Sequence, residues 1–105
     1  MNAPLPSDWF FSFATRVTAV LEQANVPLAT GDNYNTPGTR AEVQSGYSHD
    51  PQNLCALVYC EKVDAGKSMS WAPLEYKTIL ERAGYRVQAG RVPGGWDVWL
   101  VYPPA

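Results

Sequence analysis

The stretch KVDAGKSMSW, residues 62–71, contains Gly66-Lys67-Ser68, the three residues that close the phosphate-binding loop of nucleotide hydrolases. That loop also needs a glycine five positions before Gly66, where this chain has Glu61. Glu61 and Asp64 would place two negative charges beside a bound phosphate. The pattern therefore does not favour nucleotide hydrolysis, and it predicts a turn between a strand and a helix with Gly66 at positive φ.

A thiol enzyme would combine His49, the only histidine, with the thiol of Cys55 or Cys60. The sequence places no third group to orient the imidazole, and a cysteine inside an apolar strand is usually an inert packing residue. Residues five apart in a strand face opposite sides and lie about 16 Å apart, so we expect no disulfide between the two cysteines. A solvated turn histidine and free buried thiols in a reducing compartment are favoured.

Metal binding and carboxylate chemistry have no clear pattern. Two cysteines and one histidine at these spacings do not provide the ligand set of a zinc site. The acidic residues are scattered along the chain and are interpreted as surface acids, unless the fold brings two of them together: Asp32, Glu42, Asp50, Glu61 and Asp64. The sequence therefore predicts no catalytic residue, no metal and no cofactor.

Basic residues accompany the tryptophans near the C-terminus, with Arg86 and Arg91 close to Trp96 and Trp99. Cations beside indole rings are typical of surfaces that bind single-stranded nucleic acid. Ordinary ion pairing of these arginines is the alternative, and the net charge of −2 favours it. A nucleic-acid or nucleotide-ligand binder is therefore our second functional hypothesis.

Composition indicates one globular domain. The chain has 105 residues, and its apolar share of 46% is that of a protein that buries a core. Most of its four Trp, six Tyr and three Phe must fill that core, because a small domain needs large side chains to bury enough area. No basic n-region or long apolar run is present at the start, so we expect a cytoplasmic protein that does not bind membranes.

Periodicity predicts the elements of the first half. Residues 1–6 are interpreted as a flexible lead-in, and Ser7 as the N-cap of a helix over residues 8–24. Apolar residues recur there at helical spacing, at Phe10, Phe13, Val17, Val20, Leu21 and Ala24. Residues 29–40 read as a long loop, 41–48 as an edge strand, and 54–63, apolar on both faces, as a central strand.

In the second half, Ser70 is a good N-cap candidate, and Met69 with Leu74 suggests a hydrophobic staple. The helix would run to Ala83, with Gly84 as the C′ residue. Strands over residues 85–92 and 96–103 would be joined by a tight hairpin. On the second of these strands, Trp99 and Val101 face away from the other apolar residues, Trp96, Val98, Leu100 and Tyr102.

The order α-β-β-α-β-β predicts a single α+β domain over residues 1–105, with an antiparallel sheet and two helices packed on one face. The other face would expose a tryptophan unless the long loop or a partner covers it. We therefore expect a small non-enzymatic protein-binding module, a regulator, inhibitor or assembly subunit of the kind found among bacterial or phage accessory proteins. It would bind another protein or a second copy through Trp99, Trp96, Tyr34, Arg86, Arg91 and Val101.

Overall fold

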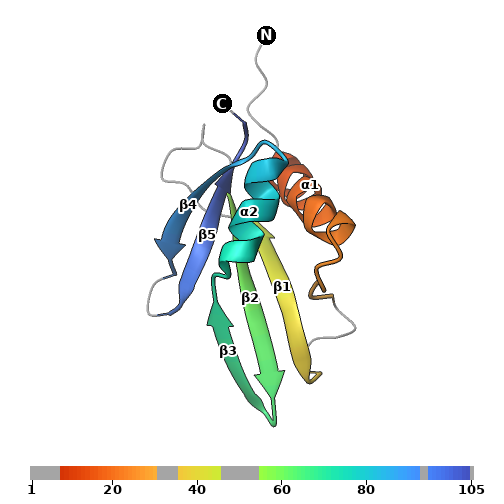
Figure 1. The fold of residues 1–105 in the computed structure, drawn as a ribbon, viewed down its shortest axis with the longest axis vertical. Coiled ribbons are helices and arrows are strands. Elements are labelled where there is room, and N and C mark those ends of the chain that lie inside the picture. Colours follow the sequence, from red (N-terminus) through yellow and green to blue (C-terminus); the bar gives the residue numbers. More distant parts are fainter. Residues whose placement is uncertain (1–7, 31–35, 46–54, 93–94, 105) are drawn as a thin grey trace.

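The computed structural model describes residues 8–30, 36–45, 55–92 and 95–104. Two helices lie on one face of a five-stranded antiparallel sheet (Figure 1), which confirms the predicted fold class. The elements in chain order are α1 (Asp8–Gln23), β1 (Gly38–Ser45), β2 (Ala56–Asp64), β3 (Lys67–Trp71), α2 (Leu74–Arg82), β4 (Arg86–Arg91) and β5 (Asp97–Tyr102). Strand β3 is an addition to the elements that the sequence predicted.

The strand order is β1-β2-β5-β4, and β3 also pairs with β2. Strand β1 pairs with β2 along its whole length, from Ala56 to Val63. The other edge of β2 is shared, because β5 pairs with residues 56–58 and β3 with residues 60–64. Strand β2 is therefore central and β1 lies at an edge, as the sequence predicted.

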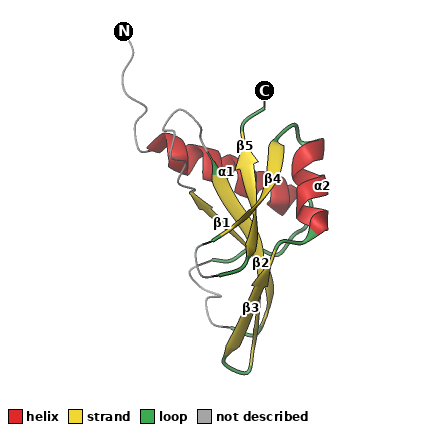
Figure 2. Cartoon of the chain, turned by 90° about the vertical axis from the view of Figure 1, so that its left-hand side faces the viewer, coloured by secondary structure: helices red, strands yellow, loops and turns green. Residues whose placement is uncertain are grey.

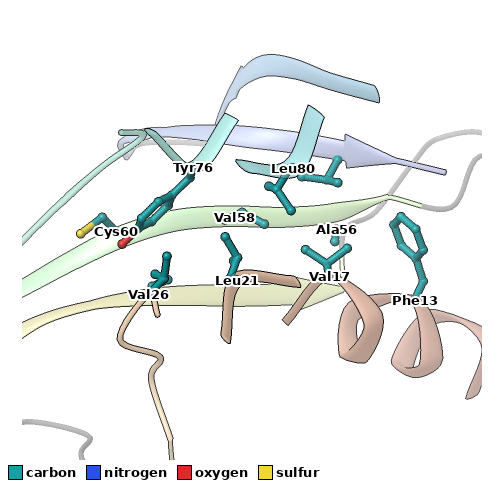
Figure 3. Packing of buried hydrophobic residues seen from close by; sticks show 11 residues of the cluster. Phe13, Val17, Leu21, Val26, Ala56, Val58, Cys60, Tyr76 and Leu80 are labelled. Atoms are coloured by element: carbon teal, nitrogen blue, oxygen red, sulfur yellow. The ribbon is translucent and has the colours of Figure 1, made fainter. Parts of the chain in front are cut away.

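The core lies between the helices and one face of the sheet, called here the helix-side face. Val17 and Leu21 of α1 and Leu80 of α2 are completely buried, and they converge on Val58 of β2 (Figure 3). The helical spacing of the α1 residues explains this placement, because it puts them on one stripe of the helix. The sheet contributes Ala41, Ala56, Cys60 and Val101 to the same cluster.

The predicted start of the second helix at Ser70 is wrong. Residues 67–71 form β3, and α2 begins at Leu74 with Pro73 as its N-cap in an extended conformation (φ −65°, ψ 135°). A two-residue turn after β2 sends the chain back alongside β2, so residues 67–71 pair as a strand and cannot be helical. The helix begins only after β3 has ended, at the extended Pro73. The end of the helix is as predicted, because Gly84 has a φ of 97° and the Tyr85 N–H donates to the Leu80 carbonyl at 3.1 Å.

The predicted loop over residues 29–40 is shorter than expected, because β1 already begins at Gly38. Ahead of it, Pro27 and Ala29 hydrogen-bond to the backbone of Ala41, at 2.7 and 2.8 Å. These bonds cover part of the outer edge of β1. The predicted lead-in (residues 1–6) and Tyr34 lie outside the described residues.

Candidate functional site

Trp99 and Val101 of the C-terminal hairpin face the helices. Val101 is completely buried, so it is a core residue and offers no surface to a partner. The Trp99 indole packs against the core, and its Nε1–H donates to the Pro73 carbonyl at 2.6 Å. The Lys77 ammonium lies 5.7 Å from the centre of the same ring. Trp99 therefore ties β5 to the start of α2.

Trp96 and Arg86 lie on the opposite face of the sheet. Trp96 is 39% exposed and its ring packs at 5.4 Å against that of Tyr59. Arg86 donates from Nε to the Pro103 carbonyl at 2.9 Å, and its guanidinium lies over the Tyr102 ring. The prediction that Trp96 faces away from Trp99 is confirmed by its contact with Tyr59, because Tyr59 follows Val58, the cross-strand partner of Trp99, and successive strand residues point to opposite faces.

Arg91 is on the helix-side face. It pairs with Asp97, which lies two residues before Trp99 on β5 and therefore points to the same face. Its Nε lies 3.2 Å from an Asp97 carboxylate oxygen in an exposed ion pair. The set of Arg86, Arg91, Trp96 and Trp99 is thus divided between the two faces of the hairpin. A single stretch of nucleic acid lying on one face would meet only half of it.

The β2–β3 hairpin extends beyond the helices (Figures 1 and 2). We call residues 60–71 the arm. Cross-strand partners share a face, and Cys60 is part of the helix-packed core. Cys60 and its partner Trp71 therefore point to the helix-side face, and so does every second residue from them along the two strands of the arm. Besides Cys60, five arm side chains lie on this face: Lys62, Asp64, Lys67, Met69 and Trp71.

A two-residue turn closes the arm at Ala65 and Gly66. Both have positive φ, 51° and 79°, which is the signature of the type I′ turn that matches the twist of paired strands. The prediction of positive φ at Gly66 is confirmed. Ala65 is a non-glycine residue in the left-handed region, where its Cβ is crowded by the following carbonyl oxygen.

The arm and the start of α2 each expose one large apolar side chain. Met69 is 65% exposed on β3, and Leu74 is 67% exposed in the first turn of α2. A shallow hollow of about 330 Å³ lies beside Met69, and its lining includes Lys62, Lys67 and Asp64. Apolar side chains flanked by two cations and one anion form a surface suited to binding rather than to bond-making chemistry. Sequence reasoning missed it because Met69 and Leu74 were assigned to a helix staple.

Two of the scattered acids do come together, on the face opposite the helices. Glu42 of β1 and Glu61 of β2 lie near Arg40, which is only 5% exposed and donates to the Thr36 carbonyl. Burial raises the pKa of Glu42, the charge of Glu61 raises it further, and that of Arg40 lowers it. Alternation along β1 puts Arg40 and Glu42 on one face, but only the register with β2 brings Glu61 beside them, and no local sequence signal encodes that register.

Both cysteines are free and buried. They lie on opposite faces, as predicted, because Cys60 belongs to the helix-packed core whereas Cys55, just before β2, hydrogen-bonds with Tyr102 on the other face. Burial raises the pKa of Cys55 and of Cys60, while hydrogen bonds with Tyr102 and Tyr76 respectively act the other way. Both thiols are therefore protonated at neutral pH. His49, the proposed base for a thiol enzyme, lies outside the described residues.

Within the residues that the structure describes, no group of three or more His, Cys, Asp or Glu side chains is arranged to hold a metal ion. No helix in that part of the chain is long and apolar enough to cross a bilayer. Comparison with family models, with curated proteins and with solved structures found no match to this chain.

Proposed function

We propose that this protein is a protein-binding module that holds its partner through the helix-side face of the arm and the first turn of α2. The observation that carries the proposal is the exposure of Met69 and Leu74, two large apolar side chains on consecutive elements. Methionine is well suited to contact surfaces, because its flexible thioether adapts to the shape of a partner. The expected role is that of a regulator, inhibitor or assembly subunit without catalytic activity.

The energetic reason is the apolar surface left in water. Full burial of a Met or Leu side chain stabilises by about 1.5–3 kcal/mol, so covering two side chains that are about two-thirds exposed is worth about 2–4 kcal/mol in total. Lys62 and Lys67 border the hollow and supply polar contacts at the rim. This site replaces the C-terminal hairpin as our candidate surface, because Trp99 and Val101 pack against the helices.

The test is site-specific photo-crosslinking. A benzophenone amino acid in place of Met69 is expected to give a discrete covalent adduct, which excess unmodified protein should compete away and Leu74→Glu should weaken. The matched control puts the same amino acid at Arg82, an exposed position in the last turn of α2. An adduct formed equally at both positions, or none at Met69, would contradict the proposal.

A further inference from the structure

The outer edge of β3 has two residues with outward-pointing backbone groups. In an antiparallel ladder, hydrogen-bonded pairs alternate with non-hydrogen-bonded ones, and a two-residue turn is closed by a hydrogen-bonded pair. Asp64 and Lys67 form that closing pair. Every second β3 residue after Lys67, namely Met69 and Trp71, therefore directs its N–H and C=O toward β2. The N–H and C=O groups of the residues between them, Ser68 and Ser70, point away from β2.

No strand among the described residues pairs with this outer edge. Figure 2 looks toward this side of the molecule and shows β3 below the β4–β5 pair, not covered by a helix. An edge with unpaired backbone groups is a template for another strand.

The order Lys67-Ser68-Met69-Ser70-Trp71 is self-complementary in the antiparallel direction. If two copies meet at Met69, Ser68 of each lies opposite Ser70 of the other, and these are the residues whose backbone groups point outward. Lys67 then lies opposite the second copy's Trp71, where a cation meets the face of an indole. The two Met69 side chains meet at a non-hydrogen-bonded position, where side chains are closest.

Other registers fit less well. Centring the pair on Ser68 would place Trp71 opposite the turn residue Ala65, and centring it on Ser70 would place Lys67 opposite Pro73, which lies outside the strand. Only the Met69 register keeps all five residues of β3 paired with strand residues. It also places no two like charges opposite each other.

We propose that the partner of the arm is a second copy of this chain, paired antiparallel along β3 about a two-fold axis at Met69. This inference rests on the proposed function, since Met69 of the proposed binding surface lies at the centre of the paired strands. The two-fold axis uses the same edge of both copies, so the assembly closes as a dimer and leaves no β3 edge for further addition. A five-residue strand makes a small interface, which belongs to the transient class.

The first experiment is sedimentation equilibrium of the full chain from about 10 µM to about 1 mM, a range suited to weak association. We expect a concentration-dependent dimer. Ser70→Pro removes an N–H that points away from β2 and leaves the bonds between β2 and β3 in place, so it should weaken the dimer at least about tenfold. An unchanged circular dichroism spectrum would show that the variant is folded, and a folded variant that dimerises as strongly as wild type would overturn the proposal.

The second experiment tests the register by oxidation. In a non-hydrogen-bonded pair the two Cα atoms are about 4.5 Å apart, within disulfide range, so Met69→Cys should form a covalent dimer. The matched control is Lys67→Cys, whose two copies would lie about 13 Å apart and should not cross-link. Native Cys55 and Cys60 are buried and contribute little background.

A monomer at all concentrations, with no disulfide in Met69→Cys, would overturn the dimer. A benzophenone adduct with a different protein at Met69 would then still support the proposed function, so the two failures are distinguishable. Equal cross-linking of Lys67→Cys and Met69→Cys would overturn the proposed register.

Discussion

Ala65 and Gly66 at the tip of the arm provide a quantitative test of the turn that sets the hydrogen-bonding pattern of β3. Ala65 has a φ of 51°, a conformation that costs an L-residue about 1–2 kcal/mol. Asparagine tolerates this conformation better, and Asn-Gly is the preferred pair for a type I′ turn. Ala65→Asn should therefore raise the free energy of unfolding by about 0.5–1 kcal/mol, or the melting temperature by about 2–6 °C.

Gly66→Ala is the matched control with the opposite sign. Gly66 has a φ of 79°, and a Cβ added there would meet no atom within 4 Å, so only the backbone conformation can oppose the substitution. We expect a loss of about 1 kcal/mol.

Urea unfolding measures both variants, with an unchanged m-value showing that the extent of unfolding is the same. A destabilised Ala65→Asn together with a neutral Gly66→Ala would refute the type I′ turn. The assignment of outward-pointing groups to Ser68 and Ser70 would then fail as well, because it starts from that turn.

Three further predictions concern the body of the domain. Trp99→Phe removes the hydrogen bond to the Pro73 carbonyl and should cost about 1 kcal/mol in urea unfolding, whereas an unchanged midpoint would contradict that role. The raised pKa of Glu42 stabilises the fold fully below its unfolded pKa of about 4.3, and this contribution is lost as the pH rises through the folded pKa. Glu42→Gln should therefore lose less stability than wild type between pH 4 and pH 7, measured by unfolding at both, and a greater loss would contradict the sign. Cys55 and Cys60 should react with a maleimide at pH 7 at least about tenfold more slowly in the native protein than in urea, and fast labelling of either would reopen thiol chemistry.

Several elements and turns could be predicted from the sequence because they depend on interactions between residues that are close along the chain. The apolar stripe of α1, the continuous apolar run of β2, and the positive φ at Gly66 and Gly84 depend only on neighbours along the chain. Strand β3 was missed because a short strand with exposed residues has a weak pattern, and because Ser70 and Pro73 resemble a helix start. Pairing with β2 makes this segment a strand, and that pairing is a tertiary contact.

The candidate site shows the same division. Alternation along the predicted strand 96–103 sufficed to separate Trp99 and Val101 from Trp96, since successive residues of a strand point to opposite faces whatever packs on it. Alternation does not tell which of the two faces the helices cover. The packing of α1 and α2 decided that, and it left Val101 buried and Trp96 partly exposed. The exposure of Met69 likewise arises because the helices end before the arm does, and no property of the residues 67–71 themselves encodes where a distant helix stops.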